Sequence, residues 1–450
     1  MTKDKVEFFI GNQDTAGRMT DLQDYSEHIK TYEISYDLFN GAGSFNASLD
    51  TRIEMNLAQK ALKFLWKING IIMMTGYIDK KEFSYSKGSL TQTITGRDMM
   101  QVLLDNYVLY VQPYEPDNAH PAGWVLKEII DDVWEKSRTI KEITTINNQG
   151  LVKRALTTPV SIPTVTFSYT TEALQLVNTI KNFKHIKTSH GQTMFDFISN
   201  LCNQIGLFLF NIPGTNEILI HAVTAPSSAL MSYNREGILS SDQPYQFRNS
   251  VKNPGSNNII NCTFSENITD FHKFTKLVGQ AQQDDSIMGN YYKDIYGKTQ
   301  GQLKIEKFEH VPEGDTPITA GDLNRGYTGL MKFKVANVNE CDLKAWVDTR
   351  DLVINNLLLQ QNRKLYNIKY TVANHSPENS TDPYFINHAA TVHDDFLGIG
   401  GSQFLVYAVS YKGSKDSGLT TDVTLCLPGT DVPGVLENIK SNVMFLEGVL

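Results

Sequence analysis

One segment of the sequence brings together side chains that could bind a metal ion. His388 and His393 are five residues apart, and Asp394 and Asp395 follow directly. Zinc ligands that come from a single segment usually follow an H-x-x-x-H spacing on a helix or include cysteines, and this segment has neither feature. It is therefore interpreted as a polar loop entering a strand, and no metal site is predicted.

Motifs for nucleotide binding and catalysis are also incomplete. The run Gly297-Lys298-Thr299 matches the end of a phosphate-binding loop, but Tyr292 stands where that motif needs glycine. The glycine-rich segment 398–401 does not open a helix, so it cannot form the usual dinucleotide site. The sequence has no G-x-S-x-G nucleophile motif, and no carboxylate pair stands in a context typical of sugar cleavage. We predict neither an enzyme nor a cofactor.

Composition predicts a folded protein of several domains. The chain has 450 residues, 41% of them hydrophobic and 20% charged, and about 150 residues per domain suggests three domains. The 49 acidic residues exceed the 41 basic ones and give a net charge of −8. Because duplex DNA is bound by basic surfaces, this balance disfavours a dedicated nucleic-acid-binding protein.

Cysteine use and hydropathy indicate a reducing compartment and no membrane anchoring. The four cysteines are far apart and form no C-x-x-C pair, so we expect reduced thiols in apolar surroundings: Cys202, Cys262, Cys341 and Cys426. The first 17 residues contain no apolar core of a secretory signal. The longest apolar stretches are far shorter than the ~20 residues of a membrane helix.

Hydrophobic periodicity predicts a β domain over residues 1–98. Apolar and polar residues alternate over 32–38 and 45–49, and Asn69-Gly70 between two apolar runs is typical of a two-residue hairpin. About six short strands of this kind indicate a small barrel or sandwich.

Residues 99–257 predict an α+β middle domain. Apolar residues recur at helical spacing after Asp98, near 124–134, after Thr171 and after Thr193. A hairpin is predicted over 207–222, and a connector with little pattern follows at 226–260.

A second β domain is predicted over residues 258–428. It includes a polar insertion at 281–330, a helix at 342–363 and two closing strands, and a tail follows at 429–450. The fold class is therefore mainly β, with two β units bracketing an α+β domain. This order suggests an internal duplication, although sequence similarity between the two units is faint. In the tail, Met444, Phe445 and Leu446 either contact another subunit or partner, or pack on their own chain.

Two strand motifs in the first β unit resemble a known family. The segment 75–79, T-G-Y-I-D, is followed by the segment 96–98, G-R-D. This pair resembles the N-terminal barrel of the baseplate hub protein of Mu-like contractile phage tails, of the late-control and spike-hub superfamily. The segments 193–222 and 258–280, the helix at 342–363 and the closing strands also look like this family, in the same order.

The motif residues have readable physical roles. Gly76 and Gly96 allow bulges or a close approach of strands. Arg97 can pair with a nearby carboxylate, for which Asp79 is the candidate, and Asp98 is predicted to cap the helix that leaves the barrel.

The resemblance implies a structural function. In this family the hub is a homotrimer whose two tube-type β-barrels per chain form a ring of six. That ring matches the sixfold tail tube or tail-tip protein, and the rest of the trimer seats the trimeric central spike among neighbouring baseplate proteins. The resemblance thus implies a virion protein of the tail baseplate, assembled in the host cytoplasm, that contacts genomic DNA only in transit.

The sequence is also consistent with two other functions. The chain could be the hub of a phage-tail-like injection particle, such as a contractile bacteriocin or a secretion apparatus. Less favoured is a cell-wall-acting enzyme whose barrels carry a substrate cleft.

Overall fold

The computed structural model describes most of the first 267 residues and several later segments. The described residues are 4–13, 19–53, 62–87, 89–109, 113–114, 119–120, 124–147, 150–179, 186–188, 191–204, 207–222, 244–267, 274–280, 304–308, 333–338, 366–378, 380–414 and 418–426. The helix predicted at 342–363 and the tail with Met444, Phe445 and Leu446 lie outside them.

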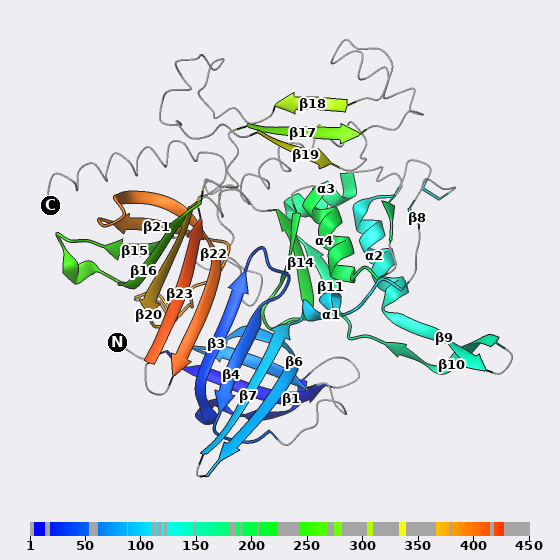
Figure 1. The fold of residues 1–450 in the computed structure, drawn as a ribbon, viewed down its shortest axis with the longest axis horizontal. Helices are drawn as coiled ribbons and strands as arrows, with labels where there is room; N and C mark the ends of the chain where they lie inside the picture. The colour runs from blue at the N-terminus through cyan, green and yellow to red at the C-terminus, as the bar shows by residue number, and fades with distance from the viewer. Residues whose placement is uncertain are drawn as a thin grey trace.

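The chain is mainly β, as the sequence predicts (Figure 1). The strands of the first β unit are β1 (Val6–Gln13), β2 (Met19–Asp24), β3 (Ile29–Asp37), β4 (Ser44–Leu49), β5 (Lys63–Ile68), β6 (Ile71–Ser86) and β7 (Ser89–Asp98). Those of the second are β15 (Tyr245–Asn249), β16 (Ile259–Glu266), β20 (Tyr366–Ala373), β21 (His388–Asp394), β22 (Ile399–Ser414) and β23 (Gly418–Cys426). Two short 3-10 helices, η1 (Ser26–His28) and η2 (Pro254–Ser256), accompany them.

All these strands belong to one 13-stranded sheet. Its main path runs β16-β20-β23-β22-β3-β4-β7-β6-β5-β1-β2, with β21 beside β22 and β15 beside β21. The antiparallel pair β22–β3 joins the two β units, although the sequence pattern predicts two separate domains. β15 lies in the segment 226–260, for which the sequence predicts only a connector, and its parallel pairing with β21 places it in this sheet.

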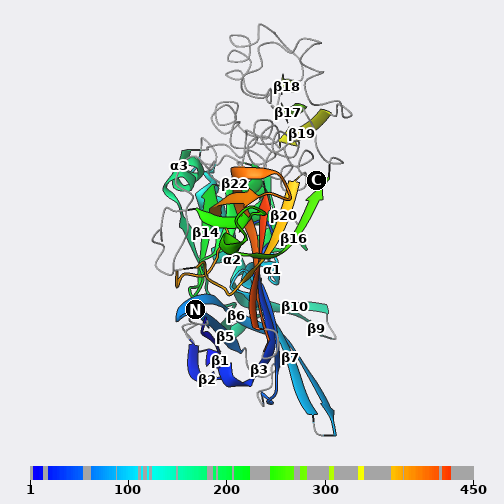
Figure 2. The ribbon, with the colours of Figure 1, turned by 90° about the vertical axis from the view of Figure 1, so that its left-hand side faces the viewer.

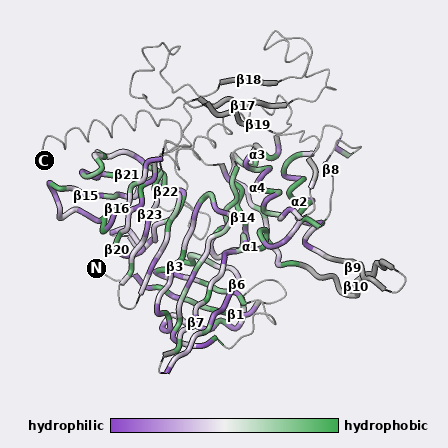
Figure 3. The backbone as a smooth tube through the Cα atoms, in the orientation of Figure 1, coloured by the Kyte–Doolittle hydropathy of each residue, from purple (hydrophilic) through white to green (hydrophobic). Residues whose placement is uncertain are grey.

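Apolar residues alternate with polar ones along these strands and build a shared core (Figure 3). In the first unit the rings of Phe8 and Trp66 stack at 4.1 Å, and those of Phe45 and Phe64 lie 4.3 Å apart. The same buried cluster continues into the second unit through residues such as Tyr411. Burying such aromatic side chains removes large apolar areas from water and stabilises both units together.

The middle segment forms an α+β unit with its own core. Its elements are α1 (Gln101–Leu104), β8 (Pro113–Tyr114), α2 (Leu126–Ser137), β9 (Thr139–Asn147), β10 (Gly150–Ser161), β11 (Thr166–Tyr169), α3 (Thr171–Thr179), β12 (Ile186–Lys187), α4 (Met194–Gln204), β13 (Leu207–Asn211) and β14 (Glu217–Ala222). The four predicted helices and the 207–222 hairpin are present with small shifts at their ends. The β9–β10 hairpin, which projects from this unit, was not predicted (Figure 1).

Three short strands form a separate sheet. β17 (Phe274–Gln280) pairs antiparallel with β18 (Lys304–Phe308) and parallel with β19 (Phe333–Val338). β18 lies inside the segment predicted as a polar insertion, so this part of the insertion is a strand.

Candidate functional site: the polar face of a duplicated sheet

Eight neighbouring strands of the large sheet form two modules with the same topology. In chain order, the first module contains β3, β4, β6 and β7, and its spatial order is β3-β4-β7-β6. The second contains β16, β20, β22 and β23, and its spatial order is β16-β20-β23-β22. In both modules the third strand in chain order is 16 residues long. In space it lies at the end of the module, next to the fourth strand. The modules are therefore topological repeats.

β-Bulges occur at equivalent positions in the two modules. A bulge inserts one residue without a partner into one strand of a pair. Lys30 and Ile260 are the extra residues in the first strands, β3 and β16. In the third strands the extra residues are Met73 and Gly401 near the start, and Asp79 and Tyr407 near the middle. Three matching irregularities make a residue-by-residue equivalence of the modules possible.

One face of this eight-stranded sheet is polar and rich in hydroxyl groups. Successive side chains of a strand point to opposite faces, and in β3, β4, β20 and residues 408–414 of β22 every second residue is buried in the core, whereas β16 and residues 79–86 of β6 contain no buried residue. The other positions carry mainly Ser, Thr and Asn with a few charges, among them Thr31, Glu33, Ser35, Asn46, Ser48, Thr91, Thr93, Thr95, Asn261, Thr263, Ser265, Asn367, Lys369, Thr371, Ser410, Lys412, Thr420, Asp422 and Thr424.

Charges in the second module and at the β22–β3 join are paired across strands. Asp422 of β23 accepts hydrogen bonds from Lys369 at 2.8 Å and Lys412 at 3.0 Å, and Lys412 also lies 3.3 Å from Glu33 of β3. Burial opposes ionisation of Asp422, but the bonds from Lys369, Thr371 and Lys412 outweigh it and hold its pKa below the usual value. The join between the units is thus an ion-paired surface.

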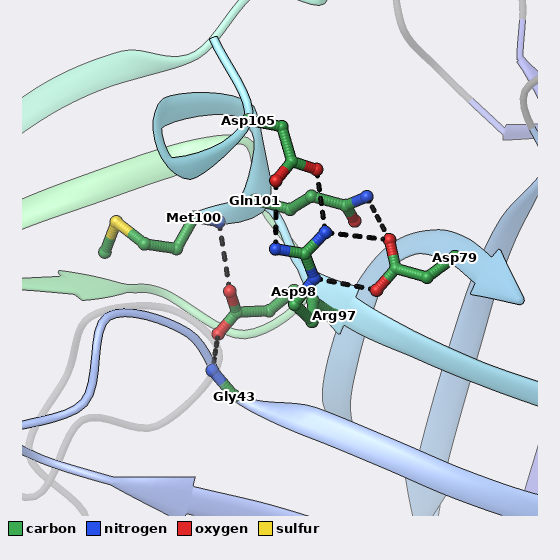
Figure 4. A network of polar contacts seen from close by, with 7 residues as sticks. All are labelled: Gly43, Asp79, Arg97, Asp98, Met100, Gln101 and Asp105. Carbon is green, nitrogen blue, oxygen red and sulfur yellow. Dashed lines mark hydrogen bonds and ion pairs between the residues drawn. The ribbon is translucent and has the colours of Figure 1, made fainter. Parts of the chain in front are cut away.

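A second charged network sits at the end of the first module (Figure 4). Arg97 of β7 donates to Asp79 through Nε at 2.7 Å and Nη2 at 3.0 Å, and to Asp105 through Nη2 at 2.7 Å and Nη1 at 3.0 Å. The Gln101 amide of α1 also donates to Asp79. These bonds raise the pKa of Arg97, so the guanidinium remains a fixed positive charge. The network ties α1 to the sheet.

The bulge explains why Asp79 meets Arg97. Ile78 pairs with Gly96 and Lys80 pairs with Thr95, so Asp79 is the residue without a partner on β7. A bulge turns its side chain relative to the regular pleat. The structure thereby brings together the pair proposed from the sequence.

Asp98 lies on the opposite, buried side of β7 and is 3% exposed. Its carboxylate accepts backbone N–H bonds from Gly43 at 2.8 Å and Met100 at 3.0 Å. Burial raises its pKa to about 7, against the lowering effect of these two bonds and of Arg97. Helix α1 begins later, after Met100, and has no side-chain N-cap bond, so the predicted role of Asp98 as its N-cap is wrong. Asp98 instead fixes the turn before α1 against the β3–β4 connection.

Gly76 and Gly96 stand where strands and rings approach closely. A Cβ on Gly76 would lie 1.9 Å from the Arg97 carbonyl oxygen and 2.7 Å from the Cα of Asp98. A Cβ on Gly96 would lie 2.5 Å from the ring of Phe45. Both positions therefore require glycine for steric reasons.

The segment that suggested a metal site forms regular structure. His388 begins β21, not a loop, and its ring stacks on Tyr245 at 4.0 Å. Asp394 accepts a hydrogen bond from the Tyr370 hydroxyl at 2.9 Å, and Asp395 binds Ser250 at 2.9 Å. Among the residues that the structure describes, no three His, Cys, Asp or Glu side chains are grouped as metal ligands. Within the same residues, no helix has the length and apolar character that crossing a membrane requires.

Comparisons with known proteins identify the fold. No family model matches the sequence, and no curated protein matches it. A tail protein from Neisseria meningitidis MC58 superposes with a TM-score of 0.56 at 14% identity, over 96% of this chain and 98% of that one. The 43 kDa tail protein of prophage MuSo2 from Shewanella oneidensis gives 0.55 at 12% identity, over 94% and 98%. The chain thus has the fold of phage tail proteins, and the resemblance inferred from the sequence is confirmed at the level of fold.

Proposed function

We propose that the chain is the structural, non-enzymatic baseplate hub of a contractile phage tail. It acts in the virion as a homotrimer that adapts the sixfold tail tube to the trimeric central spike. The observation that carries this proposal is the duplication within one sheet: two modules share strand order and bulges. The tail-protein fold of the whole chain supports it.

The duplication accounts for a change of symmetry. Three chains with two equivalent modules each present six similar units, which suits a sixfold tube or tail-tip protein. Within the described residues the α+β unit and the β17–β19 sheet each occur once, so three copies would present threefold surfaces to the spike and to neighbouring baseplate proteins. A trimer of one chain could thereby bind both a sixfold and a threefold partner, with no additional adaptor protein.

The polar face suits the wall of a channel for DNA. DNA binds tightly where basic side chains displace its counterions. On this face Lys369, Lys412 and Arg97 are each paired with a carboxylate, and hydroxyl groups fill most other positions. Paired cations hold phosphates weakly, so DNA in transit would slide past.

Native mass spectrometry of the purified chain, alone and mixed with the spike protein encoded beside it, tests the proposal. We expect a species of three times the 50.6 kDa chain mass, formed by the chain alone or on addition of the spike protein. A chain that stays monomeric in both samples, or binds no spike protein, would overturn it.

A further inference from the structure

One buried histidine holds four separate segments of the chain together. His375 follows β20 and is fully buried. Its ring Nε2 lies 2.5 Å from the Tyr32 hydroxyl of β3, and its Nδ1 lies 2.9 Å from the Thr421 hydroxyl of β23. Its backbone N–H donates to the Asp4 carboxylate at 2.5 Å, and its carbonyl accepts the N–H of Tyr384 at 2.9 Å. Every polar group of His375 is thus bound, and its two ring contacts come from different β units.

The same site holds the start of the described chain. Asp4 also accepts the N–H of Ser376 at 3.2 Å and the side-chain amide of Asn69, in the β5–β6 turn, at 2.7 Å. The Asn69 N–H donates to the Lys5 carbonyl at 2.8 Å, and the Lys5 N–H donates to Asn69 Oδ1 at 3.0 Å. We call Asp4, Lys5, Asn69, His375 and Ser376 the N-terminal clasp. It links the first β unit to the connection between β20 and β21 of the second.

The directions of the hydrogen bonds require a neutral ring in the clasp. The Thr421 hydroxyl donates to the Asn374 carbonyl at 2.7 Å, so its oxygen accepts from Nδ1–H of His375. Nε2 is then the nitrogen without a proton, and it accepts from the Tyr32 hydroxyl. A second ring proton would take this acceptor away from Tyr32 and would place a positive charge in an apolar core.

The groups around the ring do little to compensate such a charge. Three tyrosines lie around His375, on β3, on β22 and in the β20–β21 connection: Tyr32, Tyr411 and Tyr384. Burial raises the pKa of each of them, so they stay uncharged. Asp4 is the acidic group that favours the protonated ring, but its carboxylate already accepts three N–H bonds. Burial therefore dominates and lowers the pKa of His375 to about 4.

The backbone on both sides of His375 is suited to local movement. Asn374, the residue before it, has φ +63°, in the left-handed region that residues with a Cβ seldom adopt. The residues that follow include four exposed ones: Glu378, Ser380, Thr381 and Asp382. Burial in the core resumes at Pro383. A strained residue beside an exposed loop can act as a hinge when the bonds that hold it change.

We propose that the N-terminal clasp is a pH-dependent switch: binding of a proton to the His375 ring releases the N-terminal segment and the loop 375–382 while both β units stay folded. Figure 2 shows β20 and β22 of the second unit above β1 and β5 of the first, and the clasp bonds these two units to each other. After release the β22–β3 pair still joins them. The proposal does not depend on the hub function, because every group of the clasp belongs to one chain.

Proton linkage sets the size of the effect. A released, solvated histidine has a pKa near 6.5, whereas that of the closed site is about 4, so the open clasp binds the proton first as the pH falls. Between pH 7 and pH 5 the ratio of open to closed clasp should therefore rise about 20-fold.

Hydrogen–deuterium exchange of the full chain, resolved to single amides, tests the switch. The readout is the protection factor, which corrects for the intrinsic effect of pH on exchange. We expect the amides of His375, Ser376 and Tyr384 to lose about 20-fold of protection from pH 7 to pH 5, and to stay less protected than the paired amides of β4 and β7. Constant protection of the clasp amides would overturn the proposal. So would protection equal to that of β4 and β7 at both pH values, since the clasp would then open only when the whole protein unfolds.

Two histidine variants identify the group that binds the proton. In His375→Gln the clasp amides should lose their pH dependence. His388→Gln is the matched control, because His388 is also buried, its ring stacks on Tyr245, and burial lowers its pKa, but it has no contact with the clasp residues. This variant should keep the 20-fold change. The reverse pattern would assign the proton to His388 and overturn the switch at His375.

Asp4→Asn keeps the proposal testable if His375→Gln does not fold. It replaces a half-buried carboxylate and leaves the histidine in place. Because hydrogen bonds to a charged acceptor are the stronger ones, the clasp amides should be about tenfold less protected than in the wild type at pH 7. Their protection should still fall about 20-fold between pH 7 and pH 5. Wild-type protection of these amides in Asp4→Asn would show that Asp4 does not hold the clasp, and would overturn it.

Discussion

Asp79 and Tyr407 are equivalent residues with different roles. Each is the extra residue of a bulge near the middle of a 16-residue strand, Asp79 in β6 and Tyr407 in β22. In β6 this position supplies the carboxylate that binds Arg97, whereas in β22 it supplies a tyrosine that is only 7% exposed. Both modules therefore have a β-bulge at this position of the backbone, but the side chain at the bulge differs between them.

The charged network around Arg97 is expected to contribute modestly to stability. Arg97→Ala leaves Asp79 and Asp105 facing each other without their shared cation, but all three side chains are partly exposed. We expect a loss of about 1 kcal/mol in the free energy of unfolding, measured by urea titration. Lys80→Ala, which removes an exposed pair with Glu82, is the control and should change little. Equal effects of the two substitutions would show that the network adds nothing beyond a surface ion pair.

A methyl group at Gly76 should be far more damaging. The added Cβ would collide with the backbone of β7, which cannot move aside as a flexible side chain could. Gly76→Ala is therefore expected to cost about 3 kcal/mol of unfolding free energy and to lower the yield of folded protein. Gly255→Ala is a fair control, since nothing lies within 4 Å of its Cβ position. A Gly76→Ala protein as stable as the control would show that β6 and β7 do not approach as described.

Much of this architecture can be predicted from the sequence, because strands and helices follow from local patterns. Alternation over 32–38 and the Asn69-Gly70 turn suffice to place β3 and the β5–β6 hairpin. Asp79 could be proposed as the partner of Arg97 because both belong to one strand pair. These features depend on neighbours in sequence or on a single hairpin.

Long-range features could not be predicted in the same way. The β22–β3 join pairs residues that are far apart in the chain, such as Ser35 and Ser410, which are separated by 375 positions, and nothing in either strand specifies the other. The equivalence of the modules is expressed in bulges, and the bulged residues differ in type: Met73 corresponds to Gly401, and Asp79 to Tyr407. The role of Asp98 does not follow from its local sequence, because the backbone N–H group that binds its carboxylate belongs to Gly43 in a distant turn.

Asp98 should make stability fall as the pH rises. Its folded-state pKa of about 7 lies above the ordinary value of 3.8, so the folded state holds the proton more tightly than the unfolded state. The contribution of Asp98 to the free energy of unfolding is complete below pH 3.8 and is lost as the pH rises through about 7. The free-energy difference between the wild type and Asp98→Asn is therefore expected to favour the wild type by about 2 kcal/mol more at pH 5 than at pH 8. Asp422→Asn is the control, because the pKa of Asp422 is lowered and its effect on stability should not change between pH 5 and pH 8. If the difference in unfolding free energy between the wild type and Asp98→Asn were the same at both pH values, the raised pKa of Asp98 would be contradicted.

His375 should have the opposite effect and make the protein less stable as the pH falls. Its side chain lies between Tyr32 of the first β unit and Thr421 of the second. Its ring is fully buried, with Nε2 2.5 Å from the Tyr32 hydroxyl and Nδ1 2.9 Å from Thr421, and its backbone N–H donates to Asp4. Because the Thr421 hydroxyl donates to the Asn374 carbonyl, Nδ1–H donates to Thr421 and Nε2 accepts from Tyr32. The network therefore uses the neutral ring, and protonation would deprive Tyr32 of its acceptor.

Burial lowers the pKa of His375 to about 4, and the nearby Asp4 offsets only part of this effect. A folded-state pKa below the ordinary 6.5 means that the unfolded state binds the proton first, so this contribution is lost as the pH falls from 6.5 towards 4. The stability advantage of the wild type over His375→Gln should shrink by about 2 kcal/mol between pH 7 and pH 5, measured by urea unfolding. His28→Gln, at an exposed histidine, serves as the control. An advantage over His375→Gln that stays constant across this range would mean that the folded and unfolded states bind the proton equally, and that the contact between the two β units does not depend on a neutral histidine.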